Sequence, residues 1–298
     1  MLRNLYALLV GIDKYPNPGD RLNGCVNDIE AVEKFLINRL DERYSPHIEK
    51  LIDKQATRQA VIDKFENHLC QEGRDDVVLF YFCGHGSQEL AEPEFDALEY
   101  EKEPGKKKLE TVVCYDSRTV HEDGTEIRDL ADKEVRYLIA QVARNEPHIL
   151  VVFDCCHSSS GTRDTDPDRK ERIRRLPMDT RPPRKYEEFC FGRDSVIAQN
   201  LKQGVFPEGK HVFMSACLHT ETAKENDDED GKGRGAFSYF LLKELNSLNA
   251  ALSYNDLLNQ VKGHVHGRRR DQTPQIEPIG MSSQDLNSIA FLGDREGD

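Results

Sequence analysis

The sequence predicts an α/β fold in which a mostly parallel central sheet carries helices on both faces. Short apolar runs with the length of buried strands alternate along the chain with stretches that have helical spacing of apolar residues. A helical crossover usually returns the chain to the same sheet in the same direction, so this alternation favours parallel pairing. The chain has 298 residues and no stretch with the composition of a linker, so we expect one domain over residues 1–298.

Most of the predicted strands are continuous apolar runs, which indicates that both of their faces are buried. The first run, Leu5–Ile12, ends at a turn-forming segment, residues 13–19. Two later runs, Val77–Phe82 and Ile149–Phe153, contain only apolar and aromatic residues. In chain order the predicted strands are Leu5–Ile12, Ile48–Ile52, Val77–Phe82, Thr111–Tyr115, Ile149–Phe153, His211–Cys217 and Gln275–Ile279.

The predicted helices repeat apolar residues every three or four positions. In Cys25–Leu40 the apolar side chains fall on one face, and Thr57–Leu69 begins at a threonine, a residue type that caps helix N-termini. The remaining predicted helices are Lys133–Ala143, Ala236–Leu245 and Tyr254–Val261.

Three polar stretches are predicted to be loops. Residues 88–108 form a polar loop on the side of the active site, and Glu225–Gly231 forms an acidic one. Residues 159–190 are basic and contain several prolines, which predicts a long, mobile loop and not a packed element.

Composition excludes several classes of function. The net charge of −13 argues against nucleic-acid binding, and no apolar run approaches the ~20 residues that span a bilayer. The N-terminus lacks the layout of a secretory signal. Most of the eight cysteines lie in apolar runs, so we expect reduced thiols in a cytoplasmic protein that binds neither nucleic acid nor membrane.

A histidine and a cysteine follow two of the predicted strands. His85 comes after Val77–Phe82, and Cys156 comes after Ile149–Phe153. Catalytic groups in open α/β sheets gather where strands end, so the sheet is expected to bring this pair together as nucleophile and general base. Cys155 is the alternative nucleophile, because side chains alternate along a strand and only one of the two cysteines can face the cleft. We favour Cys156.

Two other interpretations of these residues stay open. In one, the cysteines are buried thiols and His85 is a loop histidine. In the other, Cys155, Cys156 and His157 bind zinc, although neighbours on a strand diverge and fit a tetrahedral site poorly. For catalysis, the turns at Gly86 and His157 are predicted to supply main-chain N–H groups to an oxyanion hole, since glycine lets the backbone turn and substrate approach.

Six strings in order along the chain resemble the caspase-like cysteine peptidases, in particular the metacaspases and prokaryotic caspase homologues. They are Leu8–Tyr15, Leu22–Asp28, Tyr81–Gly86, Asp154–Ser158, Ser215–Cys217 and Gly235–Tyr239. The resemblance implies a caspase-like fold and a His85–Cys156 dyad that hydrolyses peptide bonds through a thioester, without a cofactor in the chemical step. It also implies that the protein acts in stress, cell death or defence, in a bacterium.

The resemblance further implies a pocket that selects arginine or lysine before the scissile bond. Asp28 and Asp154 match the acidic positions of that pocket, and Cys25 and Cys83 match two further lining positions. Two carboxylates suit a guanidinium, which they bind through paired charge-assisted hydrogen bonds. The partners are then proteins with exposed arginine or lysine sites. The alternative roles are a helix N-terminal acid for Asp28 and a turn-capping residue for Asp154.

Calcium binding, which many metacaspases show, is doubtful for this chain. Residues 106–110 are mostly lysine where those relatives carry an aspartate-rich string, and Asp116 alone is not a site. The acidic run Asp227–Asp230 lacks the spacing of a calcium loop and is better explained as a solvated loop. We therefore expect no metal site.

The basic loop predicts a zymogen, because an enzyme that cleaves after arginine carries arginines just past its own nucleophile. We expect this loop to block the cleft until it is cut, either by the protein itself or by an upstream protease. The candidate processing residues are Arg163, Arg169, Arg172, Arg174, Arg175, Arg181 and Arg184. The alternative function is a catalytically inert caspase-fold scaffold or partner protein.

Overall fold

A six-stranded sheet forms the centre of the computed structural model, which describes residues 3–39, 44–92, 95, 108–121, 123–157, 172–247, 252–288 and 290–291. The order of the strands across the sheet is β11-β8-β7-β3-β1-β2, and all neighbours pair in parallel except β11, which is antiparallel to β8. The strands are β1 (Arg3–Gly11), β2 (Tyr44–Ile52), β3 (Val77–Cys83), β7 (His148–Asp154), β8 (His211–Ser215) and β11 (Gln275–Ile279). The prediction of a mostly parallel sheet in a caspase-like α/β fold is confirmed.

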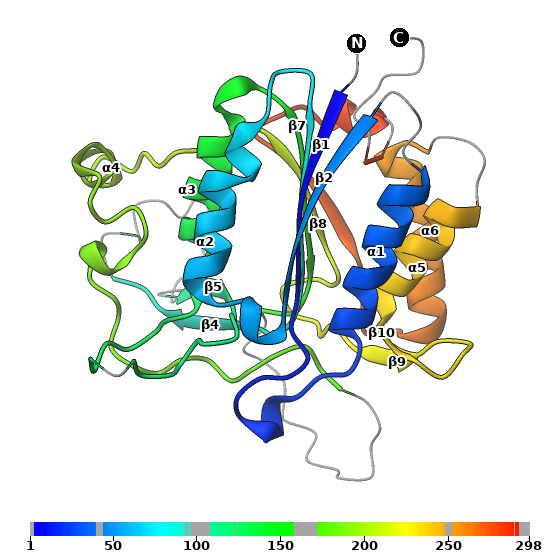
Figure 1. The fold of residues 1–298 in the computed structure, drawn as a ribbon, viewed down its shortest axis with the longest axis horizontal. Coiled ribbons are helices and arrows are strands. Elements are labelled where there is room, and N and C mark those ends of the chain that lie inside the picture. The colour runs from blue at the N-terminus through cyan, green and yellow to red at the C-terminus, as the bar shows by residue number, and fades with distance from the viewer. Residues whose placement is uncertain are drawn as a thin grey trace.

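Helices cover both faces of this sheet. Figure 1 shows α1 (Cys25–Arg39), α5 (Ala236–Ser247) and α6 (Tyr254–Arg268) on one face, and α2 (Arg58–Asn67) and α3 (Asp132–Val142) on the other. Thr57 caps α2 as predicted, since its hydroxyl accepts a hydrogen bond from the main-chain N–H of Ala60 at 3.2 Å. Every residue of β3 is buried, as a strand between two helical layers requires. None of the helices in the described ranges combines the length and apolar character needed to cross a bilayer.

Two small antiparallel units lie toward the carboxyl ends of the central strands (Figure 1). One is a sheet of β4 (Gly86–Leu90), β5 (Lys108–Val112) and β6 (Leu130–Ala131), and the other pairs β9 (Glu225–Asp227) with β10 (Gly233–Gly235). Residues 88–90 and 225–227 are therefore strands, where the sequence predicted loops, because residues 86–90 pair with residues 108–112 and residues 225–227 pair with residues 233–235. The strand predicted at Thr111–Tyr115 begins earlier, at Lys108. The short helix α4 (Ser195–Leu201) was not predicted.

The basic loop predicted at residues 159–190 is packed over the part that the structure describes, residues 172–190. Arg174 and Arg184 are fully buried, and Leu176 and Phe189 are also buried. The prediction of a mobile, unpacked loop is wrong for this part. Arginine-rich composition favours solvent exposure only where no buried carboxylate is available, and here such carboxylates come from distant parts of the chain.

Candidate active site

His85 and Cys156 follow neighbouring strands of the central sheet. Cys83 and Asp154 are paired residues of β3 and β7, and each candidate catalytic residue comes two positions after one of them. Gly86 lies so close to the Cys156 turn that a Cβ atom on it would be 2.3 Å from the carbonyl oxygen of Cys156. Only glycine fits such an approach, so this contact fixes the two turns against each other.

The imidazole of His85 is buried and oriented by two neighbours. Its Nε2 lies 2.7 Å from the carbonyl oxygen of Asp20, which can only accept, so Nε2 carries the proton of the neutral ring. Nδ1 is then the basic nitrogen. The Tyr15 hydroxyl accepts from the main-chain N–H of His85 at 2.9 Å and donates to the Val113 carbonyl at 3.0 Å, while the Tyr15 and His85 rings lie 4.8 Å apart.

The thiol of Cys156 is buried and donates to the carbonyl oxygen of Glu221 at 2.7 Å. The Cys217 thiol is a further neighbour, and its hydrogen bond with Cys156, together with burial, raises the pKa of Cys217 well above its usual range. Cys155 points elsewhere, with its sulfur 3.6 Å from Nε2 of His157. The two cysteines therefore diverge, as the alternation of side chains predicts.

Two main-chain N–H groups converge on a carbonyl oxygen that belongs to Arg174 of the basic loop. Gly86 and Cys156 each donate to this oxygen at 3.1 Å. Two main-chain donors that converge on one carbonyl oxygen have the geometry that an oxyanion hole requires. Gly86 stands where the sequence placed it, but the second donor is Cys156. The His157 side chain, also named for this turn, lies with its Nδ1 3.0 Å from the carbonyl oxygen of Thr111.

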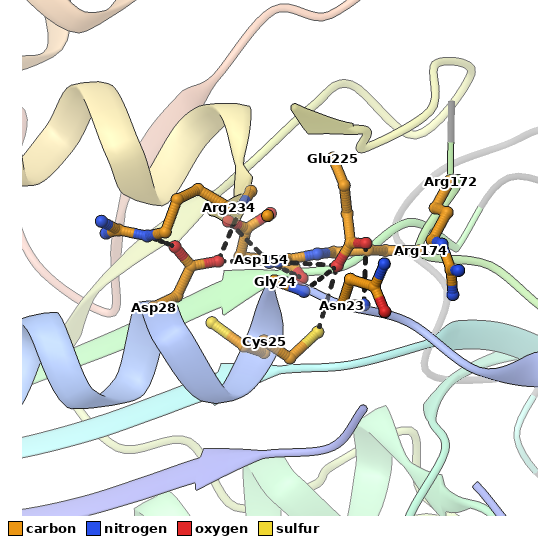
Figure 2. A network of polar contacts seen from close by, with 12 residues as sticks. Asn23, Gly24, Cys25, Asp28, Asp154, Arg172, Arg174, Glu225 and Arg234 are labelled. Atoms are coloured by element: carbon orange, nitrogen blue, oxygen red, sulfur yellow. Dashed lines mark hydrogen bonds and ion pairs between the residues drawn. The ribbon is translucent and has the colours of Figure 1, made fainter. Parts of the chain in front are cut away.

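The guanidinium of Arg174 lies in a buried pocket among acidic side chains, which Figure 2 shows. Its Nη2 lies 2.6 Å from a carboxylate oxygen of Asp28 and 3.2 Å from one of Glu225, and its Nη1 lies 2.9 Å from Asp154. The side chains of Arg174, Asp28 and Asp154 have no exposed surface. The two aspartates predicted to bind a basic side chain do so in this structure, toward an arginine of the same chain.

Further residues complete the pocket wall. Asp28 also accepts from Nε of Arg234 at 2.6 Å and from the main-chain N–H of Gly235 at 2.8 Å, and Asp154 accepts from the Ser238 hydroxyl. The sequence analysis did not identify these residues, nor Glu225, which it placed in an acidic loop. The string Gly235–Tyr239 was a signal for Gly235 and Ser238, whereas nothing in the sequence pointed to Glu225.

The two cysteines predicted to line the pocket lie at its edge. The sulfur of Cys25 is 3.8 Å from a carboxylate oxygen of Glu225, and the sulfur of Cys83 is 3.8 Å from the Ser238 hydroxyl. Burial raises the pKa of both thiols well above their usual range. Both cysteines are therefore neutral, and they shape the wall without adding charge.

The charges of the pocket explain why it requires a cation. Burial raises the pKa of the Asp28 carboxyl, although the positive charges of Arg174 and Arg234 lower it. Burial also acts to lower the pKa of Arg174, but the charges of Asp154, Asp28 and Glu225 together raise it well above its usual range. Three carboxylates face two guanidiniums, so removal of Arg174 would leave an excess of buried negative charge.

The chain on either side of Arg174 is extended across the site like a bound peptide. Before Arg174, residue Ile173 bridges Lys224 in antiparallel fashion, and the N–H of Arg174 donates to the carbonyl of Ala223 at 2.9 Å. After Arg174, the N–H of Leu176 donates to the carbonyl of Gly86 at 3.0 Å. Both halves of the segment are thus held by main-chain hydrogen bonds, and Arg174 lies between them.

The structure separates the candidate processing arginines from one another. Arg163 and Arg169 lie outside the described residues. Arg172 donates to the carbonyl of Arg21 at 2.6 Å, Arg181 pairs with Asp179 and Glu126, and Arg184 is buried between Glu89 and Glu134. Arg175 is partly exposed. Among the described members of the set, Arg174 is the one whose side chain enters the acidic pocket.

The zinc alternative is not supported by the geometry. The thiol of Cys156 faces the Glu221 carbonyl, away from the Cys155–His157 contact, so the three side chains do not converge. In the part of the chain that the structure describes, potential metal-binding side chains gather in two groups of three, which are Asp13, Cys25 and Glu225, and Asp28, Cys83 and Asp154. Carboxylates of both groups bind Arg174.

The calcium candidates also have other partners. Asp116 accepts from the main-chain N–H of Arg58 at 2.7 Å. Glu229, in the acidic run, bonds to the Tyr239 hydroxyl at 3.2 Å and to the Lys243 ammonium at 3.0 Å. Neither residue belongs to the two groups of potential ligands found among the described residues. In the described residues Asp116 and Glu229 thus bind main-chain and side-chain donors of the protein, and calcium dependence stays an untested prediction.

Comparison with known families identifies the fold and its chemistry. A model described as the caspase domain of peptidase family C14 matches residues 4–283. The chain belongs to this family. It is therefore a cysteine endopeptidase of the caspase-domain family, a hydrolase, as the sequence motifs predicted.

Individual relatives are metacaspases. Metacaspase-1 of Candida albicans is 30% identical over 93% of this chain and 66% of its own length, and metacaspase-1 of Schizosaccharomyces pombe is 23% identical over 93% and 68%. The chain thus spans about two thirds of the length of these fungal relatives. Metacaspase-9 of Arabidopsis thaliana is 23% identical over 87% of this chain and 88% of its own.

The fold itself is found in a solved structure. A crystal structure of a Geobacter sulfurreducens protein matches 98% of this chain and 97% of its own with a TM-score of 0.63, at 21% sequence identity. At this identity the likeness concerns the fold alone.

Proposed function

We propose that this caspase-domain peptidase cleaves after arginine, and more slowly after lysine, and that it is a zymogen whose own loop occupies the active site. The scissile bond of that loop is Arg174–Arg175. One observation carries the proposal: the carbonyl oxygen of Arg174 accepts from Gly86 and Cys156 while its guanidinium fills the acidic pocket. A peptide bond held at both points has the position of a substrate.

The reaction follows from these contacts. The Cys156 thiol turns from the Glu221 carbonyl, passes its proton to Nδ1 of His85, and its sulfur attacks the carbonyl carbon of Arg174. The negative charge that develops on the carbonyl oxygen is stabilised by the N–H groups of Gly86 and Cys156.

The second half of the reaction returns the proton. His85 donates it to the leaving amine of Arg175, and the C–N bond breaks to leave a thioester between Cys156 and Arg174. Water, deprotonated by His85, then hydrolyses the thioester and restores the thiol. Asp20 keeps the imidazole in the required tautomer throughout, because its carbonyl binds the Nε2 proton. No cofactor takes part.

The preference for arginine follows from the positions of the two carboxylates in the pocket. Asp28 and Asp154 approach the guanidinium from different sides and bind two different nitrogens. A lysine ammonium supplies one point charge and cannot form both contacts with the same geometry, so arginine is preferred. An aspartate side chain would be repelled by the same carboxylates.

The proposal extends to partners and setting. The substrates are proteins with exposed arginine or lysine sites, and the first cut of the loop is made by the protein itself or by an upstream protease. We place the protein in the cytoplasm, where all eight cysteines would remain thiols. Its role in stress, cell death or defence stays a prediction from family analogy.

The test is to incubate the purified protein and a Cys156→Ala variant with fluorogenic peptides that differ only at the residue before the scissile bond. We expect cleavage after arginine and lysine that is lost in Cys156→Ala, together with a new N-terminus at Arg175 in the active protein. The alanine variant is the matched control for contaminating proteases.

Two outcomes would contradict the proposal. An intact chain that cleaves none of the peptides, and that an arginyl chloromethyl ketone fails to label after limited trypsin treatment, would indicate an inert scaffold. Cleavage after aspartate, or self-processing at another bond with Arg174–Arg175 intact, would rule out the assigned pocket or scissile bond.

A further inference from the structure

The chain that follows Arg174 binds along the edge of β4. Arg175 bridges Gly86, and Asp179 bridges Glu89, both in parallel. The N–H of Leu176 donates to the carbonyl of Gly86 at 3.0 Å, and the N–H of Asp179 donates to the carbonyl of Gln88 at 2.7 Å. Residues beyond the scissile bond thus extend the β4–β5–β6 sheet as an added strand, a common mode of peptide recognition.

Two side chains add contacts to the same stretch. The carbonyl oxygen of Pro177 lies 2.9 Å from the Ser87 hydroxyl and 2.8 Å from Nη1 of Arg118, which both donate to it. Nη2 of Arg118 donates to the Ser87 hydroxyl at 2.7 Å. Because a hydroxyl has one proton, this bond leaves the Ser87 proton available for the Pro177 carbonyl.

Arg118 is held firmly in the position that makes these contacts. Its φ of 65° is in the left-handed region, which is strained for a residue with a side chain. Its Nη2 and Nε lie 2.7 and 3.2 Å from the two carboxylate oxygens of Asp129, which is fully buried and also accepts from Thr111. Strain of this kind is often found where a side chain must be presented to a ligand.

The side chain of Leu176 is also enclosed. It is 8% exposed and packs into the main hydrophobic core cluster, whereas its neighbours Arg175 and Pro177 are more exposed. The second residue after the scissile bond therefore enters an apolar environment, while the first and third do not.

We propose that the β4 edge, Ser87 and Arg118 form a binding subsite for the residues that follow the scissile bond in protein substrates. The subsite binds an extended chain through the N–H of the second residue and the carbonyl of the third, and it prefers an apolar side chain at the second position. This inference rests on the proposed function and adds recognition of the leaving side of the substrate to recognition of arginine.

The first test varies the substrate and leaves the protein unchanged. The processed enzyme is given peptides in which arginine is followed by Arg-Leu-Pro-Met, by Arg-Asp-Pro-Met, or by the first sequence with N-methyl-leucine, which has no N–H for Gly86. We expect kcat/KM about tenfold lower for each altered peptide. Equal values for the three peptides would overturn the subsite.

The second test uses Arg118→Lys, which keeps the charge but cannot contact Asp129, Ser87 and Pro177 together. The measured quantity is the ratio of kcat/KM for the long peptide to that for a fluorogenic peptide that ends at arginine. We expect this ratio to fall about tenfold in Arg118→Lys and to stay unchanged in Arg136→Lys, because Arg136 donates to the Pro207 carbonyl, away from β4. An unchanged ratio in Arg118→Lys would also overturn the subsite.

Failure of the subsite is distinguishable from failure of the proposed function. If the fluorogenic arginine peptide is cleaved but the long peptides show no discrimination, only the subsite is wrong. If the fluorogenic peptide is not cleaved at all, the assignment of the peptidase site itself fails, and the subsite with it.

Discussion

Two arginines of one segment, Arg174 and Arg184, both bury their guanidiniums between carboxylates but differ in their other contacts. Both guanidiniums are fully buried between carboxylates from other parts of the chain, Asp28 and Asp154 in one case and Glu89 and Glu134 in the other. The carbonyl of Arg174 accepts from the N–H groups of Gly86 and Cys156. The guanidinium of Arg184, by contrast, lies 4.2 Å from the centre of the Phe189 ring.

The comparison teaches that a buried arginine among carboxylates does not by itself mark a specificity pocket. Arg184 fixes the segment to β4 and α3, next to a small hydrophobic cluster that includes Phe95, Phe189 and Phe191. Arg174 differs because its peptide bond lies where a reacting bond is required. We therefore interpret Arg184 as an anchor of the segment and Arg174 as the residue before the scissile bond.

The largest expected difference between variants of Arg174 and Arg184 is in the rate of self-cleavage. In Arg174→Gln, self-cleavage at Arg174–Arg175 should be at least ~100-fold slower, because charge-assisted hydrogen bonds to three carboxylates are lost. The rate is measured by following the fragments on gels and confirming the new N-terminus by mass spectrometry. Arg174→Lys should retain slow cleavage, and Arg184→Gln should still be cut after Arg174. Equal rates of self-cleavage in Arg174→Gln and Arg184→Gln would contradict the assignment of Arg174 as the residue before the scissile bond.

The free energy of unfolding should reveal the anchoring role of Arg184. Arg184→Gln removes the guanidinium that pairs with Glu89 and one of the two that pair with buried Glu134, so we expect the free energy of unfolding to fall by about 3 kcal/mol. Urea denaturation of a Cys156→Ala background, in which no cleavage occurs, measures this loss. Lys243→Gln breaks an exposed pair with Glu229 and should leave the midpoint unchanged. A loss no larger in Arg184→Gln than in this control would show that Arg184 is not an anchor.

A lower pH should weaken the binding of arginine in the pocket through Asp28, and it should leave Asp179, in the segment after Arg174, ionised. We expect this effect to be the smallest of the three. Burial raises the pKa of Asp28, whereas the hydrogen bonds and charge of Arg181 outweigh burial and bring the pKa of Asp179 to about 2. Asp28 must be ionised to bind arginine, so acidification protonates it and weakens binding. Asp179 loses its contribution only as the pH falls through about 2, so it stays ionised at roughly pH 5 to 8.

We therefore expect KM for an arginine peptide to rise about threefold between roughly pH 8 and pH 5, measured from initial rates of the processed enzyme. Asp28→Asn should raise KM at every pH and flatten its dependence on pH. A KM that does not change over this range in the unmodified enzyme would contradict the inference that protonation of Asp28 weakens the binding of arginine.

Local patterns were sufficient to predict the central sheet and most of its helices. Apolar runs such as Val77–Phe82 and the capping threonine Thr57 act within a few residues of themselves, so their structural meaning is visible in the sequence. The glycines that flank His85 were visible in the sequence, but the close approach that requires Gly86 comes from the distant Cys156 turn. The prediction was wrong for residues 88–90, which pair with β5, and for residues 172–190, whose carboxylate partners are distant in sequence.

The sequence by itself therefore determined the class of fold, the family motifs and the pair of strand ends that carry His85 and Cys156, because periodicity and turn chemistry are local properties. Only the tertiary structure decided which arginine enters the pocket. Arg174 meets Asp28 from 146 positions away and Glu225 from 51. Burial of a charge depends on such long-range partners, since a guanidinium is stable in the interior only where carboxylates from elsewhere compensate it.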